Sequence, residues 1–369
     1  MTTFAPTPAL RVQRGNWRGV HTVAAQEFRL RLRTGRWQLL LVLWVAALAG
    51  LTWLLWRAAN SVPQLHQRGV PIFGGLMIVL LSLSLLVVPA LAGQSVNGDR
   101  ERGVLATLQV TLLTPTEIAL GKLLAAWGVS MVFLLLSVPM AVATLFAGGV
   151  GVGRLVVTLL VLAVLLGVVA AISQCWSALV SRTGLSGVLS YLSVFALTVG
   201  TLIVFGVALP ATRGSHTVTE QVPDQSAIEY QLSGGHLNLG HLPTRSQTQT
   251  RDEIRPEKVW WLLAPNPYVI LADAAPEKHK GLNLDSVTVE DNGSSQIGGS
   301  FDPLASVAAA VRGARDPGST NATGDPNAAA PVWPWGLGFD VLLAIGATVI
   351  TIRRLRTPAK RLPRGVRVA

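Results

Sequence analysis

Six long runs of apolar residues constrain this chain more than any other feature of its sequence. Five of them, up to Leu209, contain no Asp, Glu, Lys or Arg, and the sixth contains a single carboxylate, Asp340. Because a helix rises about 1.5 Å per residue, about 20 such residues cross the roughly 30 Å apolar layer of a bilayer. The sequence therefore predicts an all-α polytopic membrane protein with six transmembrane helices. The expected helices cover residues 37–56, 71–92, 123–147, 155–179, 185–209 and 333–352.

The composition and the distribution of charge both favour a membrane protein. Hydrophobic residues make up 50% of the chain and charged residues 13%, which excludes a soluble enzyme. The net charge of +11 does not indicate a nucleic-acid-binding surface. Of the 30 Lys and Arg residues, 18 fall on the termini and on the loops of one side of the membrane. The positive-inside rule then places both termini and the loop 94–122 in the cytoplasm. The excess of Arg over Lys indicates a bacterial genome, so we expect a bacterial cell membrane and no nucleic-acid partner.

The cytoplasmic N-terminus, residues 1–36, carries an amphipathic pattern. Apolar residues recur at helical spacing between Val20 and Leu32. Charged residues, including Glu27 and Arg31, occupy other positions. Such a pattern predicts a helix that lies along the inner membrane surface and contacts its lipids.

A large insert separates the fifth and sixth expected helices. Residues 210–332 are mostly polar and are expected on the extracellular side. Within them, residues 259–275 are apolar but too short to cross a bilayer, which indicates an interfacial or re-entrant segment. Residues 353–369 form a basic cytoplasmic tail.

The loop 94–122 is the long cytoplasmic connection between two spans. Polar residues begin a predicted short helix over 99–113, and three leucines at i, i+3 and i+7 form one apolar stripe along it. The stripe either docks on a partner or lies on lipid headgroups, and the pattern leaves both open. The next helix has its own start signal, with Thr114 as cap, Pro115 in the first turn and Glu117 completing a capping box. The polar residues are Asp99, Glu101 and Arg102, and the stripe is Leu105, Leu108 and Leu112.

Three catalytic interpretations fail on the sequence. Gly184–Gly187 resembles the motif of an intramembrane serine protease, but no span contains a histidine to act as base. Gly121 and Lys122 match the end of a phosphate-binding loop without the rest of it, so the chain lacks its own ATP site. The histidines of the insert are typical of solvated loops, and no metal site is expected.

Asp340 is the one ionisable residue expected inside a span. Burying it unpaired would cost on the order of 3 kcal/mol, so we expect a hydrogen bond to a neighbouring helix or to water in the outer vestibule. A role in a substrate path is the alternative.

The cytoplasmic loop resembles a known family. The run Asp99-Arg-Glu-Arg-Gly103-Val-Leu105, followed by Pro115 and Gly121-Lys122, is similar to the Glu-x-Arg-Gly-Thr-Leu … Pro … Gly-Lys signature of type-2 ABC transporter permeases. Val104 departs from the usual Thr. The leader, with Glu27 and Phe28, and the segment Pro265-Asn266-Pro267 are similar to that family too.

The resemblance implies the membrane subunit of an ATP-driven exporter. The N-terminal helix would be an elbow helix, with Glu27, Phe28 and Arg31, and 99–113 would be a coupling helix. Two separate ATPase subunits, which would carry ATP and Mg²⁺, would bind there, and a second permease chain, identical or related, would complete the pore. The alternative is a membrane anchor whose insert recruits a partner without transport. The implied coupling residues are Asp99, Glu101, Arg102, Gly103, Leu105, Leu108, Leu112, Pro115, Glu117 and Lys122.

Overall fold

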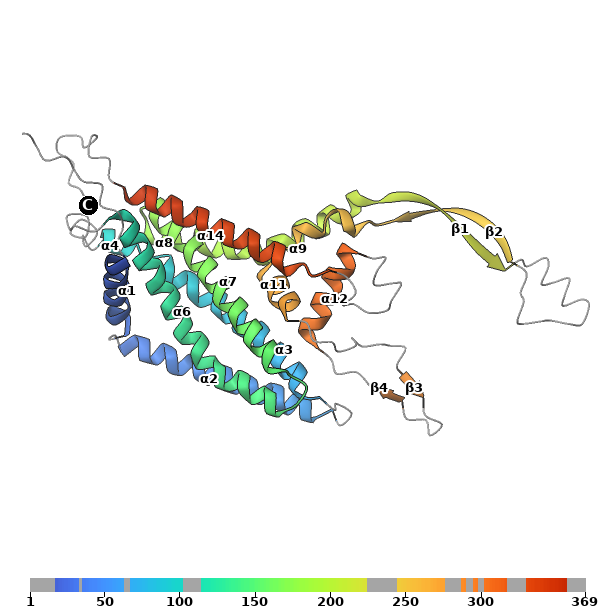
Figure 1. Cartoon of the computed structure of the whole chain (residues 1–369), viewed down its shortest axis with the longest axis horizontal. Coiled ribbons are helices and arrows are strands. Elements are labelled where there is room, and N and C mark those ends of the chain that lie inside the picture. Colours follow the sequence, from blue (N-terminus) through green and yellow to red (C-terminus); the bar gives the residue numbers. More distant parts are fainter. Residues whose placement is uncertain are drawn as a thin grey trace, which may run out of the picture.

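The computed structural model contains six helices that are long and apolar enough to cross a membrane, as expected for a multi-pass membrane protein (Figure 1). It describes residues 17–32, 35–62, 67–101, 114–223, 244–275, 287–289, 295–297, 302–316 and 330–356. The six helices are α2 (Gly35–Asn60), α3 (Gly69–Ala92), α6 (Pro115–Phe146), α7 (Val152–Leu179), the continuous α8 (Thr183–Phe195), η1 (Ala196–Gly200) and α9 (Thr201–Ala208), and α14 (Trp333–Leu355).

Each helix contains most or all of a predicted span, and the largest difference is at the start of α6. This helix begins at Pro115, well before the expected span at Leu123, because the capping box stabilises an earlier start. In the fifth helix, η1 is a π-helical turn that interrupts the α-helical hydrogen bonding.

The hydrophobic core lies between α3, α6 and α7, and the remaining spans surround it. In the apolar windows of these helices 61% of residues are buried in α7 and 50% in α3, but 11% in α2 and 6% in the α8–α9 helix. The two peripheral helices therefore present most of their apolar surface outward, where lipid or another chain can cover it.

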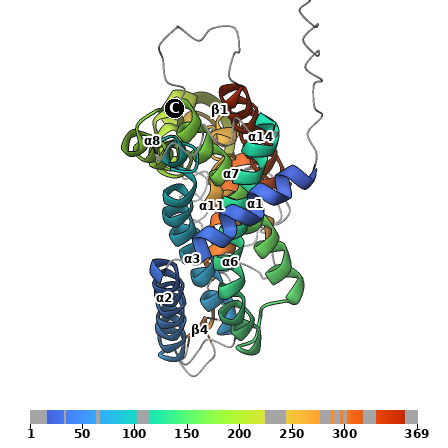
Figure 2. The same ribbon diagram turned by 90° about the vertical axis from the view of Figure 1, so that its left-hand side faces the viewer.

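The bundle has two distinct ends. Helix α1 (Trp17–Leu32), α4 (Asn97–Glu101) and the last turn of α14 lie at one end, here called the α1 end (Figure 1). Figure 2 looks toward this end and shows α1 lying across α6. The helices and hairpins of the insert lie at the opposite end, the insert end, so the first and last spans start and finish on the same side.

The insert adds β-structure to the expected all-α fold. The strands β1 (Gly214–Pro223) and β2 (Thr244–Glu253) pair antiparallel, with Gly214 opposite Glu253 and Pro223 opposite Thr244. This ribbon extends away from the bundle (Figure 1). Sequence analysis missed it because the two strands are mostly polar, and the two valines of β1 do not make the apolar alternation that marks a half-buried strand. A second, shorter hairpin joins β3 (Val287–Val289) and β4 (Ser295–Ile297).

Short helices connect the insert to the bundle. The segment 259–275, expected to be interfacial or re-entrant, contains the buried helix α11, which packs against α7, α12 and α14. Its depth in a membrane stays a prediction. The short helices are η2 (Leu209–Thr212), η3 (Pro256–Lys258), η4 (Trp260–Leu262), α11 (Pro267–Ala274) and α12 (Pro303–Arg315).

Candidate functional site

Lys122 is the centre of a buried ion cluster at the α1 end. Its Nζ donates to Oε1 of Glu27 on α1 at 2.5 Å and to Oδ2 of Asp99 on α4. The Lys122 side chain is 0% exposed, whereas the side chains of Glu27 and Asp99 are 22% and 14% exposed. Sequence analysis named all three residues as candidates, but from separate patterns. The structure brings them together and so joins three elements that are distant in the sequence.

Helix α1 reaches this position by packing closely on α6. Val20 and Val23 are buried, and a Cβ added to Gly121 would lie 2.7 Å from Cβ of Val23. Similarly, a Cβ on Gly19 would lie 2.7 Å from Cδ of Glu117. The two glycines therefore permit the close crossing that places Glu27 beside Lys122.

The two other predicted elbow residues are less well defined by contacts. Phe28 packs partly buried against the main core and faces Gly128 of α6. Arg31 is in α1, but its side chain lies outside the described residues.

Two serines fix the start of the loop 94–122. Ser177 Oγ, near the end of α7, accepts hydrogen bonds from the backbone N–H groups of Val96 and Asn97, both at 3.1 Å. Ser186 Oγ donates to the carbonyl of Gly93 at 2.9 Å. Sequence analysis predicted neither contact, since it considered Ser186 only within the Gly184–Gly187 motif and a serine in an apolar run carries no signal of its partner.

The capping box fixes the far end of the same loop, as predicted. The backbone N–H of Thr114 donates to Glu117 Oε2 at 2.7 Å, and the backbone N–H of Glu117 donates to Thr114 Oγ1 at 3.3 Å. Pro115 occupies the first turn of α6, and Glu117 is buried. Both ends of the loop are therefore attached to the bundle through side chains.

The predicted apolar stripe lies outside the described residues. The structure describes this loop as far as α4, which begins at Asn97 and ends at the exposed Glu101, and again from Thr114. The proposed coupling helix over 99–113 and its docking role stay predictions. The remaining predicted residues, which lie outside the described residues, are Arg102, Gly103, Leu105, Leu108 and Leu112.

The ion cluster is suited to holding elements together rather than to bond chemistry. Lys122 is enclosed by two carboxylates, so it is not available to a phosphate group as the lysine of a nucleotide-binding loop would be. In the part of the chain that the structure describes, no group of three His, Cys, Asp or Glu side chains could hold a metal ion.

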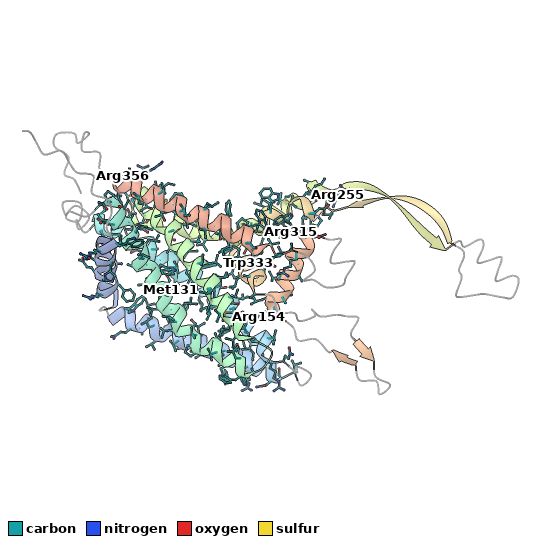
Figure 3. The ribbon with its side chains drawn as sticks, in the orientation of Figure 1. Met131, Arg154, Arg255, Arg315, Trp333 and Arg356 are labelled. Carbon is teal, nitrogen blue, oxygen red and sulfur yellow. The ribbon has the colours of Figure 1, made fainter. Side chains whose placement is uncertain are left out.

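Two further buried ion pairs lie at the insert end. Arg154 of α7 donates to Asp302, the N-cap of α12, at 2.5 Å. Arg312 of α12 donates to Oδ1 of Asp273 at 2.5 Å, and Oδ2 of Asp273 accepts from the backbone N–H groups of Val332 and Trp333 at the start of α14. These pairs attach the helices of the insert to the bundle, and Figure 3 shows Arg154 and Trp333 at this end.

Asn266, between two prolines, connects the insert to the π-helical turn. Its Oδ1 accepts from the N–H of Tyr268, which caps α11. Its Nδ2 donates to the carbonyl of Thr198 at 2.8 Å and to Oγ1 of Thr201 at 2.9 Å. One buried side chain therefore satisfies both a helix terminus and the irregular backbone of η1.

The expectation for Asp340 needs correction. It is 1% exposed, so it does not open to a vestibule, and neither carboxyl oxygen has a hydrogen-bond partner among the described residues. The expected bond to a neighbouring helix is absent there, although α14 packs on α6, α7 and α11, because no described donor lies within hydrogen-bond distance of the carboxyl group. A role in a substrate path stays a prediction.

No protein-family model matches the chain, and no curated protein matches it.

Proposed function

We propose that this chain is the membrane-spanning permease subunit of an ATP-driven exporter of the ABC type. It would form half of a translocation pathway and couple to separate ATPase subunits at the α1 end. In this proposal both termini are cytoplasmic, and the insert lies outside a bacterial cell. The sequence resemblance in residues 99–123 motivates the family.

The observation that carries the proposal is the cluster of Glu27, Asp99 and Lys122. A coupling element must transmit force between an ATPase and the spans. This requires that both ends of the element are rigidly attached to the bundle. The cluster ties α1, α4 and α6 into one unit, and the serine contacts and the capping box attach the loop to α6, α7 and α8. Residues 102–113 therefore connect two firmly held points, as a segment that receives an ATPase should.

The outward apolar faces support pairing with a second permease chain. Helix α2 and the α8–α9 helix bury little of their surface in this chain. Packing against another copy or a related chain would cover part of these faces within the bilayer.

The test is a site-specific crosslink from the loop. A photoreactive amino acid at Glu101, the exposed last residue of α4, should capture a protein that hydrolyses ATP, whereas one at the exposed Ser61 should not. In parallel, Leu105→Asp with Leu108→Asp should lower the ATPase activity that co-purifies with the chain more than a hundredfold. Burying two leucines contributes at least about 3 kcal/mol, which corresponds to that factor.

Thr107→Asp is the matched control, because position 107 lies off the stripe on the predicted helix. It should leave ATPase recovery within about twofold of the unmodified chain. Full recovery with both leucines charged, or equal loss in the control, would contradict docking through the stripe.

A membrane anchor that recruits a partner through its insert is the second candidate. The pairs Arg154–Asp302 and Asp273–Arg312 favour it, because they attach the insert firmly while the β1–β2 ribbon projects from the bundle. Under this alternative, a crosslinker placed at Thr248 on β2 captures a partner and one at Glu101 captures no ATPase.

A further inference from the structure

An apolar groove opens on the side of the bundle at the insert end. It has a volume of about 720 Å³ and lies between the η1 region of the fifth helix, η4 and the first turns of α14. This volume falls within the usual range for a bound small molecule. Several lining side chains face outward, with Trp261 58% exposed, Trp335 66% and Val204 52%. The groove therefore faces the surroundings of the spans rather than the core of the bundle.

Among the residues that the structure describes, Arg315 is the one charged residue that lines the groove. Its guanidinium lies 4.9 Å from the ring centre of Trp260, and its Nη1 donates to the carbonyls of Ala330 and Pro331. It forms no ion pair with any carboxylate in the described ranges. Figure 3 shows Arg315 near Trp333, at the start of the last span. A partly exposed arginine with donors left over is suited to bind phosphate.

The fold builds the groove from irregular backbone. The π-helical turn at Ala196–Gly200 widens the fifth helix, and Gly200 contributes no side chain. Asn266 holds this turn through Thr198 and Thr201. Turns of this kind occur frequently at functional sites.

We propose that the groove binds one anionic phospholipid from the leaflet at the insert end. An acyl chain occupies the apolar groove, and the phosphate of the headgroup binds Arg315. Tryptophan side chains are enriched at the headgroup region of a bilayer, because the indole ring is apolar and its N–H group is polar. The tryptophans of the groove are consistent with a position at this level. The inference does not depend on the exporter proposal, since an anchor would bind the same lipid.

The test measures lipid retained by the full chain. The protein is reconstituted in nanodiscs of equal parts phosphatidylglycerol and phosphatidylcholine, released into mild detergent and examined by native mass spectrometry. Arg315→Gln should lower retention of phosphatidylglycerol about tenfold relative to phosphatidylcholine, whereas Arg315→Lys should keep most of it. Arg57→Gln is the matched control, because Arg57 also lies over a tryptophan, Trp53 at 5.7 Å, but outside the groove.

A second variant tests the acyl site separately. Val204→Trp fills the groove and should lower retention of both lipids, and Val207→Trp, on the same helix but outside the groove, should not. Equal retention in Arg315→Gln and the unmodified chain would overturn the proposal. Loss of bound phosphatidylglycerol to millimolar inorganic phosphate alone would also overturn it. So would a Val204→Trp variant that no longer forms dimers but keeps its lipid, because a second copy of the chain would then be what covers the groove.

Discussion

Replacing Lys122 by Met tests whether the ion cluster holds the α1 end together. Methionine keeps the length and much of the apolar volume of the lysine side chain but removes its charge. Glu27 and Asp99 would then be left close together and mostly buried, with no cation between them. Removing one partner of a buried ion pair typically costs about 3 to 5 kcal/mol. Because both carboxylates retain some exposure, we expect about 3 kcal/mol.

The free energy of unfolding can be measured in mixed micelles by titration with sodium dodecyl sulfate. Lys258→Met is the matched control, because Lys258 is exposed at the insert end, and its replacement should change stability by less than about 0.5 kcal/mol. Hydrogen exchange should locate the effect, with faster exchange in α1 and α4 and no change in α11.

A triple variant distinguishes the loss of lysine packing from the burial of carboxylates that have no cation beside them. Adding Glu27→Gln and Asp99→Asn to Lys122→Met removes all three charges, so most of the lost stability should return. Two results would refute the reasoning. One is a Lys122→Met protein as stable as the unmodified chain, and the other is a triple variant no more stable than the single one.

Three further predictions concern other parts of the chain. Asp340→Asn should keep or raise the free energy of unfolding, because the carboxyl group is buried without a described partner, and a loss of stability in micelles would contradict this. Asp273→Asn should lower it by about 3 kcal/mol, because Arg312 loses its counter-charge, as the same titration would show. In whole cells that carry Cys175→Ser, cysteine at Thr248 should react with an impermeant thiol reagent and cysteine at Thr107 should not. Labelling of Thr107 alone would reverse the proposed orientation.

The apolar spans could be predicted from the sequence because the bilayer constraint acts on local composition. A run of about 20 apolar residues has few alternatives to a membrane helix, whatever it packs against. The capping box at Thr114 and Glu117 was equally predictable, since its partners are three residues apart. Both signals need no knowledge of the tertiary fold.

The contacts that assemble the site could not be predicted in the same way. Lys122 and Glu27 are separated by 95 positions, and a charge outside a span does not specify which opposite charge it will meet. The resemblance named both residues without pairing them. Arg154 lies just before the expected span at 155–179 and carries no signal of a partner in the sequence, although it is buried against Asp302 in the structure. The pairing of such residues depends on how the helices cross.

Helix α7 connects the two ends of the bundle, and its contacts differ in strength. At the α1 end Ser177 holds the start of the loop through two hydrogen bonds, each worth about 1 kcal/mol. At the insert end Arg154 holds α12 through a buried ion pair, which is costlier to break. The helix between them has 28 residues and is about 42 Å long, which is enough to span a bilayer.

If the bundle changes shape when a partner binds residues 102–113, the loop end should therefore separate from α7 before the insert does. Ser177→Ala should make that separation easier and speed hydrogen exchange at Val96 and Asn97, while exchange in α12 stays unchanged. Faster exchange in α12 with no change at Val96 would contradict this order.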